Sequence, residues 1–260
     1  MARNPDAIGR GLRRCLPSAW IDRFDRPIDR LIFGSCAILL LGVFALDMVA
    51  WGPGVEVLLG HDFRLNIDAT ARWLDGGAFY PANQLSGPFY EEGVGILYPP
   101  TTLLLFAPFA ILPVQVSAAL WWGLPAAAVA WQLYRLRPRP IVWPFLAICV
   151  AWPATALTIV VGNPSILFIG ILALGTLHAW PAALIFLKPS VFPFALWGIR
   201  YRSWWVAAVV LAALSIPFGS LWLQWITVLL NSRIGGVFHS VQQVPLFLFP
   251  VIVWFGRSSR

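Results

Sequence analysis

A long apolar segment near the N-terminus is the feature that most restricts how this chain can fold. Leu31 to Trp51 is continuously hydrophobic apart from a single acid, Asp47. A helix needs about 20 such residues to cross the hydrocarbon core of a bilayer. The segment follows a polar arm and has no small-residue cleavage signature, which indicates an uncleaved signal anchor and not a removable signal peptide.

The composition extends this interpretation to the whole chain. Of 260 residues, 59% are hydrophobic and only 11% are charged, and the mean hydropathy is +0.76. An outer-membrane barrel would show short strands that alternate apolar and polar residues, whereas the apolar runs here are continuous. We therefore expect an all-α integral membrane protein, a polytopic helical bundle with a first external loop that carries juxtamembrane helices.

The arginines predict the topology of the bundle. The formal net charge is +7, but the arginines form separate short clusters beside hydrophobic segments and not one stripe, which argues against a nucleic-acid partner. Short arginine-rich loops stay on the cytoplasmic side of a membrane. We expect an inner-membrane protein whose cytoplasmic parts are the N-terminal arm 1–30, the loops at 135–139 and 200–202, and the tail 257–260.

We expect residues 31–256 to form one membrane domain, in which the hydrophobic segments cross the bilayer and the polar segments form loops. It has an external loop at 52–98 and a second external segment at 221–243. The segment 99–112 is bracketed by prolines and too short to span, so we expect a juxtamembrane or half-inserted helix. Residues 180–197 should form two short helices that meet at an external break. The expected crossings are 31–51, 114–134, 141–160, 166–178, 204–219 and 244–255.

The carboxylates point to the first external loop as the place where acid/base chemistry could occur. All eleven acids lie at or before Glu92. On a helix, Arg64, Asp68 and Arg72 would stand four residues apart and form an ion-pair ladder, with Asp75 close by, so surface pairing explains Asp68 and Asp75. Asp62 has no such basic neighbour, and capping of a helix N-terminus is the structural alternative for it. The other acids at or beyond the first crossing are Asp47, Glu56, Glu91 and Glu92.

Lys188 is the single lysine and lies inside the apolar stretch LIFLKPSVF. An ionisable residue at bilayer depth costs about 2.5–3.5 kcal/mol on insertion scales and is a functional candidate for that reason. The alternative is a lysine that snorkels to the interface. The cysteines and histidines lack metal-ligand spacing, so we predict no cofactor and leave the metal requirement open.

Five segments, taken in order, resemble glycosyltransferase family 87, the polyprenol-phosphate-mannose-dependent mannosyltransferases of the GT-C superfamily. HDFRLNIDATARWLDGGAFY is similar to the family's loop after the first helix, and YPPTTLLLFAPFAILP to its Tyr-Pro-Pro segment. VVGNPSILFIGILAL looks like its Gly-Gln-x-Asn helix start and AALIFLKPSVFPF like its Lys-Pro break. LWLQWITVLLNSRIGG is loosely similar to the second external loop.

The resemblance implies transfer of a sugar, mannose in that family, from a polyprenyl-phosphate donor to a glycan or lipid acceptor on the external face. Asp62 matches the family's catalytic position, Tyr98 lies in the segment that shapes the floor of the site, and Lys188 lies near the lipid phosphate. A leaving group that is already anionic needs little protonation, so one base suffices, and an inverting displacement with Asp62 as general base is expected. Arg64, Arg72 or Lys188 would stabilise the phosphate charge.

Other features leave alternatives open. Asn163 stands where the family usually has glutamine, Asn66 and Ile67 replace an aromatic pair, and the chain is shorter than other members. A truncated or non-catalytic relative that binds lipid phosphates or a partner protein is one alternative. A subunit of a transporter or flippase is another, although transporters more typically show inverted repeats with paired broken helices.

Overall fold

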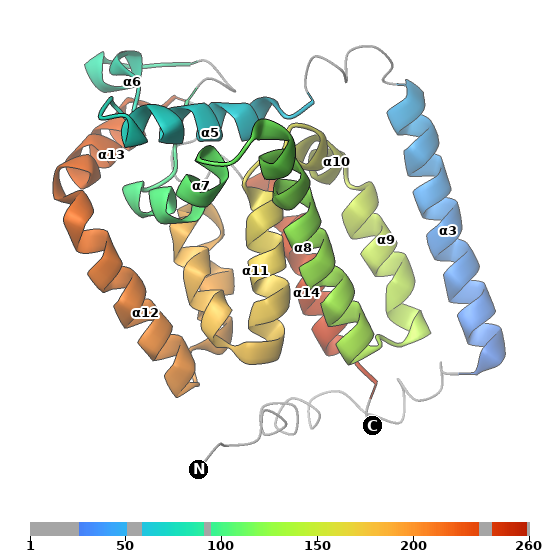
Figure 1. The fold of residues 1–260 in the computed structure, drawn as a ribbon. Coiled ribbons are helices and arrows are strands. Elements are labelled where there is room, and N and C mark those ends of the chain that lie inside the picture. Colours follow the sequence, from blue (N-terminus) through green and yellow to red (C-terminus); the bar gives the residue numbers. More distant parts are fainter. Residues whose placement is uncertain (1–25, 51–58, 91–94, 234–240, 259–260) are drawn as a thin grey trace.

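The computed structural model describes residues 26–50, 59–90, 95–233 and 241–258, with the backbone alone for 47–50. Apart from two isolated bridge pairs, every element in these ranges is a helix (Figure 1). The α-helices are α3 (Pro27–Ala50), α5 (His61–Leu74), α6 (Ala82–Ser86), α7 (Leu103–Ala110), α8 (Val114–Leu136), α9 (Trp143–Ala151), α10 (Pro153–Val160), α11 (Ser165–His178), α12 (Arg202–Ser215), α13 (Gly219–Asn231) and α14 (Val244–Phe255). The 3₁₀ helices are η2 (Pro100–Thr102), η3 (Pro140–Val142), η4 (Trp180–Leu187), η5 (Pro189–Gly198), η6 (Ile216–Phe218) and η8 (Val241–Gln243).

Three helical segments are long and apolar enough to cross a membrane. They are residues 27–46 of α3, all of α8, and the run from Arg202 to Asn231 that joins α12 to α13. The bent pair formed by η3–α9 and α10 makes a fourth candidate. The outward side chains of these helices are apolar, as with Leu39 and Val209, which are 68% and 64% exposed. The expectation of an all-α integral membrane protein is confirmed.

The expected crossing 141–160 is not straight, which corrects the sequence interpretation. Its two helices meet at an angle of 60°, and Trp152 between them has an extended backbone with φ −64° and ψ 127°. Pro153 supplies the reason, because proline disfavours a helical conformation in the residue before it and cannot donate a backbone hydrogen bond.

The two short broken segments have the predicted form. Residues 99–112 contain η2 and the eight-residue α7, far shorter than a spanning helix. Residues 180–197 form η4 and η5, which meet at Lys188, a residue with non-helical φ −123° and ψ 84°. Pro189 begins η5, a position where its missing N–H costs nothing.

The arginine-rich segments gather at one end of the bundle. The start of α3, the loop after α8, the start of α12 and the C-terminus all lie there, whereas α5, α6 and α13 cover the opposite end (Figure 1). Arg139 N donates to Gly256 O over 2.8 Å, and Ser258 N donates to Leu136 O over 3.3 Å. We call the opposite end, which carries α5, the loop end. Orientation in the membrane remains the prediction from the arginines.

The predicted second external segment, 221–243, begins within α13. This helix packs against α6 at the loop end and continues directly from α12 through η6. Asn231 Nδ2 donates to Gln84 O over 2.9 Å, which fixes the end of α13 to α6. Residues 234–240 of the segment, and the side chains of Asp47, Glu56, Glu91 and Glu92, lie outside the described residues.

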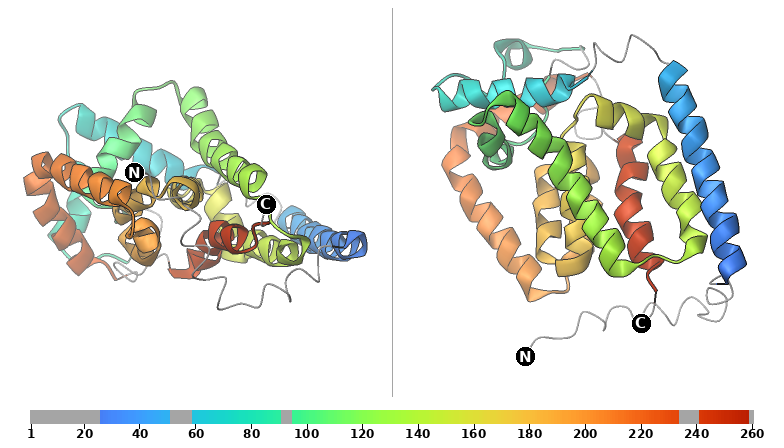
Figure 2. Two further views of the ribbon diagram at one scale, coloured as in Figure 1. Left: turned by 90° about the horizontal axis from the view of Figure 1, so that it is seen from below. Right: turned by 45° about the vertical axis from the view of Figure 1, so that its right-hand side comes forward.

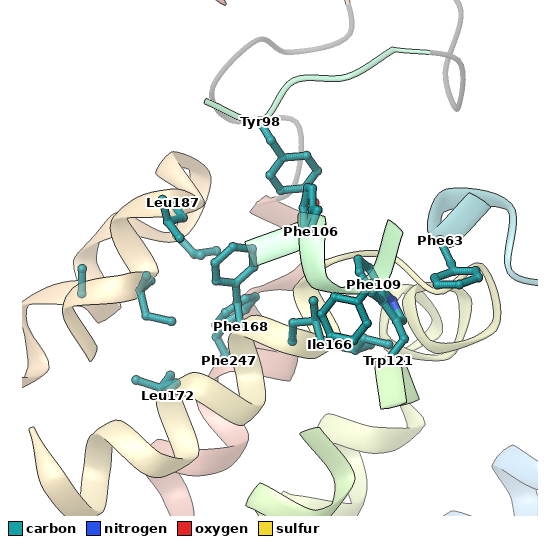
Figure 3. Packing of buried hydrophobic residues seen from close by; sticks show 14 residues of the cluster. Phe63, Tyr98, Phe106, Phe109, Trp121, Ile166, Phe168, Leu172, Leu187 and Phe247 are labelled. Carbon is teal, nitrogen blue, oxygen red and sulfur yellow. The ribbon is translucent and has the colours of Figure 1, made fainter. Parts of the chain in front are cut away.

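Two aromatic-rich clusters hold the bundle and the loop end together. The larger one lies between α5, α7, α8, α11, η4, η5 and α14, and Figure 3 shows Trp121, Phe106, Phe168 and Phe247 packed within it. The second cluster, which includes Phe79 and Val228, joins α5 to α13. Helix α3 stands at the edge of the bundle and packs against α9 (Figure 2). The larger cluster reaches the loop end at Tyr98 and Phe63, where it supports the candidate site.

Candidate active site

Helix α5 holds Asp62 at the loop end by docking its first turn on the end of α10. The backbone N–H groups of Asp62 and Phe63 both donate to Val161 O, over 2.8 and 3.2 Å. These are N–H groups that a helix leaves without intrahelical partners. The N-cap residue is Gly60, and no side chain caps the helix. The capping alternative for Asp62 is therefore wrong, and its carboxylate is available for other contacts.

The turn after α10 brings Asn163 to this carboxylate. Gly162 has φ +67°, and a Cβ atom there would lie 2.6 Å from Trp122 and 2.9 Å from Phe63. Only glycine fits both the backbone conformation and the space. Asn163 Nδ2 donates to Asp62 Oδ2 over 2.6 Å, a short bond typical of a charged acceptor.

The orientation of the Asn163 amide is set by its oxygen. Oδ1 accepts from Ser165 N over 3.0 Å, from Ser165 Oγ over 2.6 Å and from Tyr98 OH over 3.3 Å. Because these three donors occupy the oxygen, the amide NH₂ must face Asp62. Residues from three separate segments therefore share one hydrogen-bond network.

Tyr98 extends the network to Lys188. Lys188 Nζ donates to Tyr98 OH over 3.1 Å and lies 4.9 Å from the centre of the tyrosine ring. Both residues are buried, with Lys188 only 1% exposed. The ring of Tyr98 packs against Phe106 and Phe168 (Figure 3), whose ring centroids lie 5.8 and 6.4 Å from its own. Four residues that the sequence singled out therefore form one chain of contacts, Asp62–Asn163–Tyr98–Lys188; their chemical roles stay predictions.

Burial and neighbouring charges act in opposite directions on Asp62. Burial raises the pKa of its carboxyl above the ordinary value, whereas the hydrogen bond from Asn163 and the charges of His61 and Lys188 lower it, and the net shift is upward. A carboxylate with a raised pKa is a stronger base when ionised, which suits a group that must accept a proton.

Two residues that the sequence interpretation did not single out complete the network. Ser165 Oγ lies within hydrogen-bonding distance of both Asn163 Oδ1 and the side-chain amide of Gln243. The contact at Gln243 is to its Oε1, so Ser165 donates its single hydroxyl proton to one of the two amide oxygens at a time. Ser165 lies in the quoted segment VVGNPSILFIGILAL. Gln243 gave no signal, because nothing local connects it with a residue 78 positions earlier.

The two arginines proposed for phosphate contact do not join this network. Arg72 donates through Nε to Ala78 O over 2.7 Å and through its second guanidinium nitrogen to Phe79 O over 3.2 Å, at the far end of α5. Arg64 is exposed and donates to Leu59 O over 3.3 Å. Arg72 therefore closes the turn after α5. Among the described residues, no group of three His, Cys, Asp or Glu side chains could hold a metal ion.

Fold and site together define an all-helical integral membrane protein with a partly buried carboxylate linked to a buried lysine at one end of its bundle. The family model for glycosyltransferase family 87 matches residues 97–256, a range that includes Tyr98, Asn163 and Lys188 and begins after Asp62. The chain belongs to this family.

One curated relative is the polyprenol-phosphate-mannose-dependent alpha-(1-2)-phosphatidylinositol mannoside mannosyltransferase of Mycobacterium tuberculosis. It is 27% identical over 196 residues, which cover 73% of this chain and 32% of the relative. The chain thus spans about a third of the length of the relative it matches. No solved structure matches it.

Proposed function

We propose that this protein transfers a mannosyl group from a polyprenyl-phosphate donor to a hydroxyl of a glycan or lipid acceptor. Family membership and the name of the mycobacterial relative support this activity. The observation that carries the proposal is the network itself, in which a carboxylate and an amine from distant parts of the chain meet through Asn163 and Tyr98. One group can accept a proton while the other faces an anion.

The proposed reaction is a single displacement. The Asp62 carboxylate takes the proton of the acceptor hydroxyl as its oxygen forms a bond to the anomeric carbon. The bond from that carbon to the phosphate oxygen breaks, and polyprenyl phosphate leaves with the electron pair. Attack opposite the leaving group inverts the anomeric centre. The ammonium of Lys188 stabilises the negative charge that develops on the departing phosphate.

We place this chemistry on the external face. The arginine clusters lie at the opposite end of the bundle, which the positive-inside rule assigns to the cytoplasm. Nucleotide sugars are cytoplasmic, so an external enzyme needs a donor carried by a lipid. A lipid-linked donor and an external site are therefore mutually consistent.

Replacement of Asp62 tests the proposal. Purified protein in liposomes is given radiolabelled polyprenyl-phosphate mannose and an acceptor mannoside, and labelled product is counted. Asp62→Asn should reduce turnover by at least about a hundredfold, since general-base catalysis contributes roughly 10²–10⁴-fold. Asp68→Asn, which alters an exposed carboxylate on the same helix, is the matched control and should retain turnover within about twofold.

Full turnover by Asp62→Asn would remove this residue from the base role. Wild-type protein that binds polyprenyl phosphate but transfers no sugar would favour the second candidate, a non-catalytic member that binds the lipid.

A further inference from the structure

Two arginines and two aromatic rings form one exposed stack at the arginine-rich end of α8. The rings of Trp131 and Tyr134 are stacked, with their centroids 5.7 Å apart. The guanidinium carbon of Arg135 lies 5.4 Å from the centre of the Trp131 ring, and that of Arg137 lies 5.8 Å from the centre of the Tyr134 ring. Trp131 is 44% exposed and Tyr134 is 62% exposed. The stack therefore faces the surroundings of the protein and not its core.

The charges of this stack lack a carboxylate partner in the part of the chain that the structure describes. All eleven acids lie at or before Glu92, so α8 and every later element contain none. Asp29, the one acid that the described ranges place at this end of the bundle, accepts a bond from the backbone N–H of Arg26 over 3.0 Å. Arg135 and Arg137 are both exposed. Their surface is complementary to an anion that comes from outside the protein.

Arg137 has a backbone conformation that an arginine seldom adopts. It ends α8 with φ 46° and ψ 67°, in the left-handed region where glycine is the usual residue because it has no Cβ atom. Strained residues of this kind gather at functional sites, where the strain is part of how a group is positioned. A glycine would end the helix at a lower cost, but it would carry no guanidinium over the Tyr134 ring.

An apolar stripe continues from the stack along the outer face of α8. Leu124, which is 53% exposed, lies about two helical turns before Trp131 and so on the same face. Leu120, 37% exposed, lies about one turn further along. A ligand with an anionic head and a hydrocarbon chain can contact both the arginines and this stripe, whereas a free phosphate can contact the arginines alone.

We propose that the stack binds an anionic phospholipid of the leaflet at the arginine-rich end. Arg135 and Arg137 donate hydrogen bonds to the phosphate oxygens in the forked geometry of the guanidinium group. The two rings lie at headgroup depth, where tryptophan and tyrosine are enriched, and an acyl chain lies along Leu124. Because the candidate active site is at the opposite end of the bundle (Figure 1), this inference does not depend on sugar transfer.

Conservative replacement of the two arginines tests the site. Arg135→Lys/Arg137→Lys keeps the positive charge on which topology depends but loses the forked donors. Binding of dioleoyl-phosphatidylglycerol and of zwitterionic dioleoyl-phosphatidylcholine to purified protein in dodecyl maltoside is measured by native mass spectrometry. Wild type should bind the anionic lipid at least about tenfold more tightly. The double variant should lose about tenfold in that affinity, the effect of one hydrogen bond to a charged group.

The same end of the bundle offers a matched control. Arg200→Lys/Arg202→Lys makes the same exchange at two exposed arginines beside α12 and should keep phosphatidylglycerol affinity within about 1.5-fold of wild type. Trp131→Leu, which removes the ring beneath Arg135, should weaken binding by about threefold to fivefold, as expected for an exposed cation–π contact. Its control is Trp180→Leu, at a tryptophan that follows α11 and is 49% exposed; binding should again stay within about 1.5-fold.

Three results would overturn the proposal. The first is equal binding of the two lipids by wild type, and the second is unchanged binding by Arg135→Lys/Arg137→Lys, which would leave these arginines with a topological role alone. The third is an equal loss in Arg200→Lys/Arg202→Lys, which would show a general effect of surface charge. Inorganic phosphate at about a hundredfold excess should leave the lipid bound, and its complete displacement of the lipid would overturn the assignment of the Leu124 stripe to an acyl chain.

Discussion

At the scale of single residues, Tyr98 connects the amine of Lys188 to the carboxylate of Asp62 through hydrogen bonds. Its hydroxyl accepts from Lys188 and donates to Asn163, whose amide in turn donates to Asp62. Each hydrogen bond in this series is therefore donated in the direction of the Asp62 carboxylate. The arrangement favours the ionised form of Asp62, which burial alone would disfavour.

Gln243 should act as a positioning residue for this carboxylate. Gln243→Leu removes the partner of Ser165, so the Asn163 amide loses part of its restraint. We expect kcat for sugar transfer to fall by roughly ten- to a hundredfold with the KM for the donor almost unchanged, because small misplacements of reacting groups carry costs of this size. Initial rates over a range of donor concentrations measure both constants.

The pH dependence of the same variant gives a readout that a merely structural role would not change. The proposed base, Asp62, must be ionised to accept a proton, so the rate of sugar transfer should fall as the pH drops through its raised pKa. The Asn163 bond lowers that pKa, and loosening it should move the acid limb to higher pH. Gln132→Leu, at a buried glutamine bonded to Thr176 and Pro250 O, is the control and should keep the wild-type limb. An unmoved limb in Gln243→Leu would contradict the role.

Residue types and positions identified Asp62 and Lys188 before any geometry was known, because rare polar residues in an apolar chain are conspicuous, whereas Tyr98 and Asn163 were identified through the family resemblance. Arg72 does not join this network and donates to Ala78 O and Phe79 O instead. Ten residues along a helix from Asp62 amount to about 15 Å, so a shared helix does not mean a shared site.

At the scale of elements, the turn between α10 and α11 controls the site. Gly162→Ala should destabilise the protein by roughly 2–5 kcal/mol, the sum of about 1–2 kcal/mol for the left-handed backbone and about 1–3 kcal/mol for overpacking against Trp122 and Phe63. Denaturant titration in mixed micelles measures the change. Sugar transfer should fall as well, because Asn163 is the next residue.

Gly76 offers a matched control for this substitution. It also has a left-handed φ, +85°, but a Cβ atom there would meet nothing within 4 Å. Gly76→Ala should therefore show only the backbone cost of about 1–2 kcal/mol. If both variants lose the same stability, close packing at Gly162 contributes nothing.

Proline effects explain which breaks were predictable. Lys188 and Pro189 interrupt an apolar run together, and a polar residue beside a proline is a visible break. Pro153 lies in an uninterrupted apolar sequence. Hydropathy shows that such a segment is hydrophobic, but it does not show whether the helix axis bends within it. The 60° bend after α9 therefore could not be read from hydropathy alone.

At the scale of the whole molecule, the arginine clusters predict that α5 is external. In a background without the native cysteines, Asp68→Cys on α5 should react with a membrane-impermeant maleimide added to intact spheroplasts, since Asp68 is exposed. Ser203→Cys, exposed near the start of α12, should react only after the membrane is permeabilised. Ser203 should be protected in intact spheroplasts because short arginine-rich loops stay on the cytoplasmic side of the membrane.

The two positions are each other's control. Labelling of Ser203→Cys in intact spheroplasts together with protection of Asp68→Cys would invert the topology and place the site in the cytoplasm. Hydropathy and arginine distribution predicted which segments share an end of the bundle, because both are properties of whole segments. Packing between segments, such as α13 against α6, depends on how side-chain shapes fit together. Hydropathy and arginine distribution carry no information about that fit.

Lys188 follows Asp62 by 188 − 62 = 126 residues, and no local contact can bring the two together. During synthesis Asp62 is translated before the later helices and before Lys188. A nascent chain halted before residue 188 thus lacks the side-chain amine that the proposed mechanism requires. The proposed activity should therefore arise only once the later helices have been added.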